Sequence, residues 1–347
     1  MKFATRTTPF MHAGTSVATT MRQVILALLP VVITQTWFFG PGVLLNVLTS
    51  LVVAVIAESC ILKIRGRDWR LFINDYSAVI TALLLALCLP PGTPWWITVV
   101  GTLFAIVIGK HLYGGLGYNI FNPAMAGYAA VLISFPEQVG QWRVPDASGF
   151  SQLAPSLQQT LQYFLSGQLS TGDIDAFTRA TPLDSIKVEL NRMQTLTEIT
   201  EDPVFGSFGG RGWEWINAAG LLGGIWLIKT GVIRWYIPFA MLITIIILAT
   251  TFSLASPDLR PTPFLHLFSG ATMLGAFFVA TDPVSAPASK RGMLIYGAGT
   301  GLLVYVLRTW GAYPDGIAFA VLLMNLTVPL LDRYTQPPVY GHGGRNG

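Results

Sequence analysis

Long apolar stretches recur along this chain of 347 residues, and short polar connections separate them except for one long polar segment in the middle. A transmembrane helix needs about 17 to 25 apolar residues, and most of these stretches reach that length. They cover residues 22–38, 42–62, 77–91, 94–110, 121–136, 213–229, 233–254, 263–281, 292–308 and 316–332. The pattern predicts an all-α polytopic membrane protein with about ten transmembrane helices, of which the third and fifth are the shortest.

The composition agrees with this pattern and excludes a water-soluble surface. Hydrophobic residues make up 52% of the chain and charged residues 11%, and the mean hydropathy is +0.56. The first 20 residues are polar and contain no apolar core followed by a small-residue cleavage site, so we expect no cleaved signal peptide. The first span should therefore remain in the mature protein.

Lys and Arg residues are concentrated in alternate connections between the predicted spans. The connections assigned to one side contain Lys63, Arg65, Arg67, Arg70, Lys110, Lys229, Arg234, Lys290 and Arg291. Cytoplasmic loops carry an excess of such residues, so both termini should be cytoplasmic and the long polar segment should lie outside, in the periplasm or its equivalent. This bias accounts for the basic pI of about 9.1, and nothing indicates binding to nucleic acid.

The polar segment divides the spans into two groups of five, which must have opposite topology because five is odd. Weak matches at near-constant spacing support a repeat, such as Asp68 to Arg70 with Asp258 to Arg260, and residues 77–91 with 270–283. We therefore expect two inverted five-helix repeats with a long extracytoplasmic loop between them. The predicted divisions are a cytoplasmic N-terminal segment 1–21, a first membrane repeat 22–136, the loop 137–212, a second membrane repeat 213–332 and a cytoplasmic tail 333–347.

An unusual polar run rich in glycine and asparagine occupies residues 109–124 and includes Lys110, Asn119 and Asn122. It suits either a tight inner loop with close helix packing, or a pocket for an isoalloxazine ring or a gate for ions. Its counterpart in the second half contains Asp282 next to a proline, which suits either a helix terminator or an ion-handling group. Both alternatives stay open for both runs.

Charged side chains are scarce inside the spans, and Glu58 is the one carboxylate clearly within a span. It could pair with Lys63 or Arg65 at the membrane boundary, or take part in a proton or sodium relay. The two cysteines and four histidines show no C-x-x-C or paired-histidine spacing, so the sequence predicts no complete iron–sulfur or zinc site. The spans also lack a chain of carboxylates that could relay protons, which indicates that any ion pathway is shared with other subunits.

The long polar segment contains a motif built from Asp175, Thr178, Ala180 and Thr181. Thr181 precedes Pro182, which is typical of a helix N-cap with proline at the first helical position. The motif also resembles Asp-x-x-Ser/Thr-x-Ala-Thr, the sequence at which flavin transferases join the phosphate of FMN to the final threonine. Arg179 stands where the family usually has glycine. An N-cap favours a nearby phosphate, so both interpretations can hold.

Several stretches together resemble one protein family. Residues 75–91, the 109–124 run, Thr178 to Leu183 and residues 277–287 are similar to the D subunit of the Rnf electron transport complex, and the resemblance covers nearly the whole chain. A related family is the B subunit of the sodium-pumping NADH:quinone reductase. That subunit usually has a longer N-terminal segment than the roughly twenty residues found before the first span, so the Rnf assignment is preferred.

The resemblance implies a subunit, inactive alone, of a bacterial inner-membrane translocase that couples electron transfer between NADH and ferredoxin to Na⁺ or H⁺ transport. Thr181 would carry a covalent FMN, and a second, non-covalent flavin could bind between the spans. The implied partners are the A, B, C, E and G subunits of the Rnf complex, the flavin transferase and membrane lipid. A flavin-free solute or ion permease and a structural anchor for redox partners are the alternatives, because ten spans in an inverted repeat suit them too.

Overall fold

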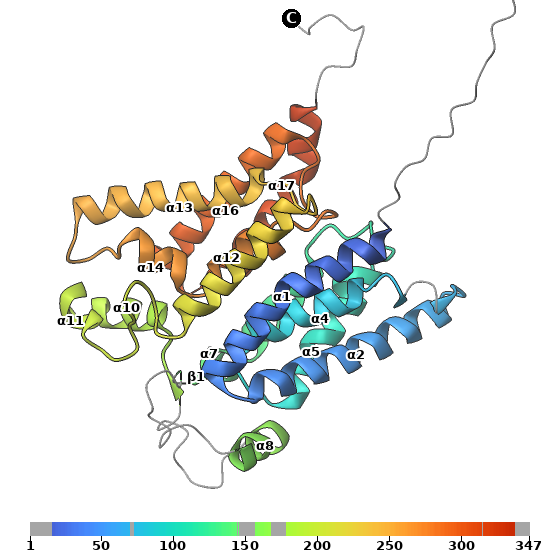
Figure 1. Cartoon of the computed structure of the whole chain (residues 1–347), viewed down its shortest axis with the longest axis horizontal. Helices are drawn as coiled ribbons and strands as arrows, with labels where there is room; N and C mark the ends of the chain where they lie inside the picture. The colour runs from blue at the N-terminus through green and yellow to red at the C-terminus, as the bar shows by residue number, and fades with distance from the viewer. Residues whose placement is uncertain are drawn as a thin grey trace, which may run out of the picture.

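The computed structural model describes residues 16–69, 73–143, 145, 157–167, 178–313 and 315–336, and these are mostly helical (Figure 1). The first half contains α1 (Val17–Phe39), α2 (Gly42–Ile64), α4 (Ser77–Cys88), α5 (Trp95–Leu103), the π-helix η1 (Phe104–His111) and α6 (Pro123–Ser134). The second half contains α12 (Trp213–Lys229), α13 (Tyr236–Ala255), α14 (Pro263–Phe268), α15 (Thr272–Leu274), the π-helix η2 (Gly275–Val279), α16 (Lys290–Trp310) and α17 (Ile317–Thr335).

The described part of the intervening segment holds short elements. These are α7 (Pro136–Gly140), β1 (Trp142–Arg143), α8 (Leu157–Ser166), β2 (Thr178–Arg179), α10 (Pro182–Asn191) and α11 (Leu196–Thr200). Strands β1 and β2 pair antiparallel and form a two-stranded sheet. The prediction of an all-α fold is therefore confirmed, with this small ribbon as the exception.

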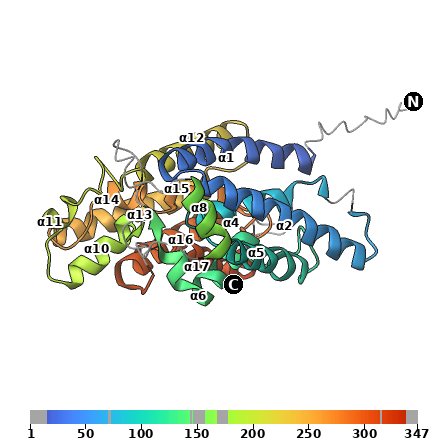
Figure 2. The same cartoon turned by 90° about the horizontal axis from the view of Figure 1, so that it is seen from below.

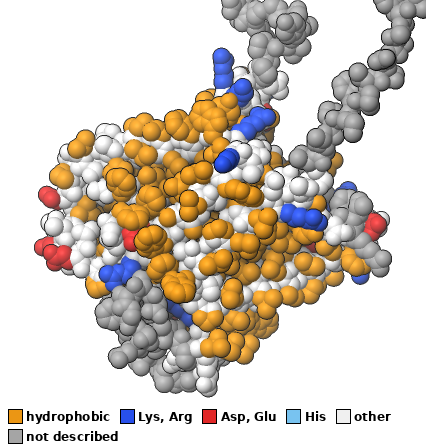
Figure 3. All heavy atoms as spheres, viewed as in Figure 1, with side chains coloured by type: hydrophobic (Ala, Val, Ile, Leu, Met, Phe, Trp, Pro, Cys, Tyr) orange, Lys and Arg blue, Asp and Glu red, His pale blue; other side chains and the backbone are white. Residues whose placement is uncertain are grey.

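Five helices are long and apolar enough to cross a membrane by length and composition, namely α1, α2, α13, α16 and α17. Shorter apolar helices occupy the third, fourth and fifth predicted spans, and α12 occupies the sixth. Hydrophobic side chains cover the face seen in Figure 3, over α13, α12 and α1, without an interrupting band of charge. Such a surface matches lipid rather than water, so the chain is a multi-pass membrane protein.

The third helix of each half is interrupted or short, for a reason visible in the sequence. Helix α4 ends before the pair Pro90 and Pro91, because proline removes a backbone donor and restricts the preceding residue. The expected single span over 263–281 is instead broken into α14, α15 and η2. The break falls at Gly270, whose φ of +63° suits glycine and ends the helical hydrogen bonding.

The two halves run in opposite directions where they meet. Helices α1 and α12 lie side by side in both views (Figures 1 and 2), with Gly223 against Ala27 and Gly212 against Phe38, so they are antiparallel. Within the halves, α13 packs on α16 as α2 packs on α5, and α17 packs on α16 as α6 packs on η1. The packing therefore has the relationship expected of an inverted repeat.

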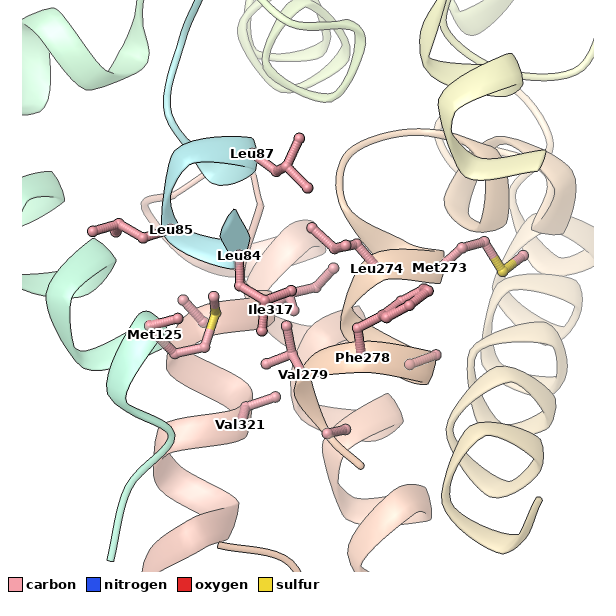
Figure 4. Packing of buried hydrophobic residues seen from close by; sticks show 14 of the residues in the cluster. Leu84, Leu85, Leu87, Met125, Met273, Leu274, Phe278, Val279, Ile317 and Val321 are labelled. Carbon is pink, nitrogen blue, oxygen red and sulfur yellow. The ribbon is translucent and has the colours of Figure 1, made fainter. Parts of the chain in front are cut away.

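Both halves contribute to one continuous apolar core. Leu84 of α4, Met125 of α6, Val279 of η2 and Ile317 of α17 converge in its centre (Figure 4). A second, smaller cluster attaches α10 and α11 to the membrane helices, through Leu183 and side chains that include Leu265 of α14. Burial of these side chains fixes α10 and α11 on one end of the bundle, next to α14 in Figure 1.

Candidate functional site

Thr181 is the N-cap of α10, as the sequence predicts. Its backbone is extended, its Oγ1 accepts a hydrogen bond from the Asp184 backbone N–H at 3.2 Å, and Pro182 is the first helical residue. The fixed φ of proline suits that position, and the threonine oxygen satisfies one of the donors that a helix start leaves free. Thr181 is half-buried, and the preceding Ala180 is exposed. The threonine hydroxyl is therefore held at the start of a ten-residue helix.

The strand before Thr181 connects the motif to the end of the first half. Trp142 pairs with Arg179 and Arg143 with Thr178 in the ribbon of β1 and β2. The backbone of Thr178 is thus placed beside the chain that follows α7, while Asp175 lies outside the described residues. The ribbon holds the motif close to the junction of the two halves.

A cavity of about 1040 Å³, including its opening, lies beside Thr181, and we call it the Thr181 cavity. Its walls come from α4, α6, α15, η2 and α17 together with Trp142 and Trp213, so both halves and the polar segment contribute. The Trp142 and Trp213 rings lie 4.6 Å apart between centroids, and the lining is mainly apolar. Cofactor pockets are mostly apolar in this way, and aromatic walls suit a flat aromatic ring system.

Two carboxyl groups face the Thr181 cavity. Burial raises the pKa of the Asp184 carboxyl, and Lys187 opposes that shift in part. Asp315 is held differently: its Oδ2 accepts from the Ala271 N–H at 2.8 Å, and its Oδ1 accepts from Arg308 at 3.0 Å. The negative charge of Asp315 is thus compensated, whereas Asp184 favours the neutral form more than an exposed aspartate does.

A second cavity of about 820 Å³ lies between the halves near the start of α4, and we call it the Lys110 cavity. It is lined by Lys110, Asn119, Asn122 and Asp282, so the structure brings together four residues that the sequence singles out. Glu58 is in contact with this group through its ion pair with Lys110. Residues from both halves therefore share one polar site, although nothing in this geometry assigns their chemical role.

The expectation that Glu58 pairs with Lys63 or Arg65 is wrong. Glu58 Oε1 accepts a hydrogen bond from Lys110 Nζ, both side chains are only 2% exposed, and His111 Nε2 lies 3.4 Å from the same oxygen. Arg65 instead donates to the backbone carbonyl of His111. Lys110 is within reach because α2 packs against η1. A carboxylate removed from water is stabilised by a cation that is buried beside it, rather than by one at the membrane boundary.

The glycine and asparagine run forms a tight loop and also lines the Lys110 cavity. Gly114, Gly115 and Gly117 have positive φ and make the turn after η1. Asn122 then caps α6 through the Met125 N–H and donates to the carbonyl of Val279 at the end of η2. The close-packing interpretation is confirmed, while a role as flavin pocket or ion gate stays a prediction.

Asp282 follows η2 in a local turn. Its Oδ2 accepts from Ser285 Oγ at 2.8 Å, and its backbone carbonyl accepts from the Ala286 N–H at 3.1 Å. The side chain nevertheless lines the Lys110 cavity. Asp282 is thus a helix terminator that is also available to a ligand in that cavity.

The sequence interpretation missed Arg308, a buried cation near the end of α16. Its guanidinium donates to the carbonyls of His266 and Ser269, to Thr272 Oγ1 and to Asp315. A charge at the end of a predicted span is typical of a residue at the membrane boundary, so the apolar pattern alone does not single out Arg308. Its position 198 residues after Lys110, close to the spacing of the repeat, was the signal that could have identified it.

Comparison with known proteins identifies the family of this chain. The model of the NQR2, RnfD, RnfE family matches residues 4–341. A protein of Aliivibrio salmonicida is 48% identical over 99% of both chains, one of Vibrio cholerae serotype O1 is 49% identical over 99% of this chain and 100% of its own, and one of Escherichia coli O127:H6 is 46% identical over 99% of both. Each is named as the D subunit of an ion-translocating oxidoreductase complex. The family expected from the sequence motifs is confirmed, and this chain belongs to the NQR2, RnfD, RnfE family.

Proposed function

We propose that this chain is a membrane subunit of an ion-translocating oxidoreductase complex and that it carries FMN as a phosphoester on Thr181. The observation that carries the proposal is the position of Thr181: its hydroxyl is held at a helix start on the edge of a largely apolar cavity of about 1040 Å³. The names of its relatives support the oxidoreductase part. Bound FMN would supply electron transfer in steps of one or two electrons.

The start of α10 suits the phosphate end of such a group. The first N–H groups of a helix lack intrahelical partners and favour an anion, and Pro182 directs the chain into the helix without using a donor. Burial raises the pKa of the nearby Asp184 carboxyl, which lessens repulsion between that side chain and a phosphate. Thr181, Pro182 and Asp184 would therefore orient the phosphoester.

The Thr181 cavity suits the ring end. Trp142 and Trp213 form an aromatic wall, and Met125 and Leu274 close the interior with apolar surface that excludes water. Asp315 and Tyr313 bring polar atoms to a limited part of the lining. These residues would hold a planar ring beside the membrane core and limit its contact with solvent.

The Lys110 cavity is our proposed site for the second ligand, which is either a non-covalent flavin or the transported Na⁺ or H⁺. Its lining is largely apolar, as in many ligand pockets, and Lys110, Asn119 and Asn122 supply polar groups. Asp282 and the buried pair of Glu58 with Lys110 supply ionisable groups for a cation. Flavin extracted from the Thr181→Val variant would favour the first ligand, and its absence the second.

The rest of the assignment follows the family resemblance. We propose that the complex couples electron transfer between NADH and ferredoxin to ion transport, that it also contains the A, B, C, E and G subunits, and that a flavin transferase modifies Thr181. The chain would lie in the bacterial inner membrane with both termini cytoplasmic and the 137–212 segment periplasmic. The basic side chains Arg234, Lys290 and Arg291 lie together at one end of the second half, which supports this orientation.

In-gel flavin fluorescence of the denatured polypeptide tests the proposal, with the chain expressed alongside an active flavin transferase. Wild type should fluoresce after denaturation, Thr181→Val should not, and Thr181→Ser should retain part of the signal because it keeps a hydroxyl. Thr195→Val is the matched control, since Thr195 is also a threonine N-cap in the same segment. A colourless wild-type polypeptide would instead support a permease or a structural anchor.

A further inference from the structure

A third hollow, separated from the Thr181 cavity by Leu183, is lined by an excess of positive charge. It lies between α10, the connection from α13 to α14, and the end of α16, it measures about 860 Å³ including its opening, and we call it the basic cleft. Its polar lining residues are Lys187, Asn191, Arg260, His266, Arg308 and Thr309. Among the described residues that line it there is no carboxylate. An anion is therefore the ligand that the charges favour.

The three cations of the basic cleft differ in how far their charge is compensated. Arg308 pairs with Asp315, which faces the Thr181 cavity instead. Lys187 donates to the carbonyls of Gly311 at 2.8 Å and Tyr313 at 2.9 Å, which are neutral partners. The guanidinium of Arg260 lies 5.1 Å from the centre of the Trp310 ring. The cleft thus keeps net positive charge after its internal contacts are made.

Other charged groups stand around the basic cleft without entering its lining. Asp184 is one turn before Lys187 on α10 and faces the Thr181 cavity, and Asp258 is exposed two residues before Arg260. Burial lowers the pKa of Lys187, and the charge of Arg308 adds to that effect while Asp184 opposes it. An anion in the cleft would relieve the repulsion between the two cations.

A buried histidine supplies a second and independent sign of a ligand. His266 is only 3% exposed and lines the basic cleft, and neither ring nitrogen has a hydrogen-bond partner in the described structure. The Nε atom of Arg308 is buried without a partner among the described residues as well. Buried polar atoms are nearly always satisfied, so donors left free on the wall of a cationic cleft indicate that an acceptor binds there.

The surroundings of the basic cleft decide which anion is suitable. Leu259 and Trp310 line it and expose more than half of their surface. Leu254 in the last turn of α13 and Phe264 at the start of α14, which flank Arg260 in the sequence, are also more than half exposed. Exposed apolar side chains next to a tryptophan and an arginine are typical of the boundary between hydrocarbon and headgroups. A phospholipid matches both features of this boundary, because its phosphate group suits the cations and its acyl chains suit the exposed apolar side chains.

We propose that the basic cleft binds the phosphate of an acidic phospholipid from the leaflet on the side of the polar segment. Arg260 contacts the phosphate oxygens, Lys187 adds charge, and a ring nitrogen of His266 donates a hydrogen bond. The acyl chains lie along Leu254 and Phe264. A bound lipid would join α10, and with it the segment that bears Thr181, to the membrane helices α14 and α16.

Native mass spectrometry and lipid extraction of the full chain test this proposal. The chain is purified, given equal amounts of phosphatidylglycerol and phosphatidylcholine, and compared with Arg260→Gln and His266→Phe. We expect phosphatidylglycerol to be retained preferentially by wild type and about tenfold less by Arg260→Gln, since one charge-assisted contact is lost. Arg234→Gln is the control, because Arg234 is an exposed arginine just before α13, far from the cleft.

Three outcomes would overturn the proposal. The first is equal retention of both lipids by wild type, and the second is an equal loss in Arg260→Gln and Arg234→Gln. The third is displacement of the lipid by inorganic phosphate at equal concentration, which would make the site one for free phosphate. Flavin fluorescence of Arg260→Gln should match wild type, so failure of the lipid proposal is separable from failure of the Thr181 assignment.

Discussion

Each half of the molecule buries a cation near the end of its fourth helix, and the two cations are held in different ways. Lys110 donates to Ser77, the first residue of α4, and Arg308 donates to Thr272, the first residue of α15. Lys110 therefore stabilises the start of α4, and Arg308 stabilises the start of α15, which follows the break at Gly270 in the third span of the second half. Because the halves are inverted, one cation serves each end of the bundle.

The difference lies in the counter-charge. Lys110 is neutralised by Glu58, and both side chains are buried. Arg308 spreads its donors over carbonyls and over Asp315, which is 25% exposed and also accepts from two backbone N–H groups. In the first arrangement both charged side chains are buried, whereas in the second the carboxylate is partly exposed and the cation has several neutral acceptors besides it. Both halves thus have a buried cation that stabilises a helix start. In the first half this cation also belongs to a buried ion pair beside a cavity.

The largest effect is expected for Lys110→Met, which leaves Glu58 buried without its cation. The free energy of unfolding should fall by about 3–5 kcal/mol, the usual cost of an uncompensated buried charge. Denaturant unfolding in detergent, followed by tryptophan fluorescence, measures it. The double variant Glu58→Gln with Lys110→Met should be the more stable of the two, and equal stability would show that Glu58 is not the source of the cost.

A smaller loss, of about 2–3 kcal/mol, is expected for Arg308→Met in the same measurement. The carbonyls of His266 and Ser269 lose a donor, but Asp315 keeps its bonds from the backbone of Ala271 and Ile317. Arg308→Met should therefore be more stable than Lys110→Met. The reverse order would contradict the distinction between a fully buried ion pair and a cation whose donors are shared among several acceptors.

The smallest effect on stability is expected for Asp184→Asn, because this substitution leaves the backbone N–H that Thr181 accepts from at the start of α10 in place. Burial raises the pKa of this carboxyl above its ordinary value of 3.8, so the folded state binds the proton more tightly than the unfolded state. The favourable contribution of the protonated Asp184 carboxyl to the stability of the fold is present at low pH. It is lost as the pH rises through the pKa of Asp184 in the folded state. The variant should show a flatter dependence of Tm on pH above 3.8 than wild type; an unchanged slope would contradict the assignment.

Much of the fold was predictable because its helices are bounded by local signals. The sixth span begins and ends where the apolar run does, at Trp213 and Lys229, and the N-cap at Thr181 follows from the proline after it. The eighth span was predicted as one helix, and its break at Gly270 was missed. Hydrophobicity continues through that break, so the apolar pattern alone does not reveal it.

The candidate sites were predictable in part. Lys110, Asn122 and Asp282 were identified by their unusual polarity beside spans, and the structure places them around one cavity. The partner of Glu58 was predicted wrongly because it comes from another helix, 52 residues away in sequence. Arg308 was missed for the same reason: its acceptors lie on α14, α15 and the connection before α17, and only packing brings them together.

Peptide mass spectrometry tests the central claim most directly, because the motif contains two threonines, Thr178 and Thr181. The chain is produced with an active flavin transferase and digested, and fragmentation locates the added mass. We predict an FMN phosphoester on Thr181, whose hydroxyl lies at the helix start beside the cavity. An adduct on Thr178, or an unmodified peptide from a preparation in which the transferase modifies another substrate, would contradict this account.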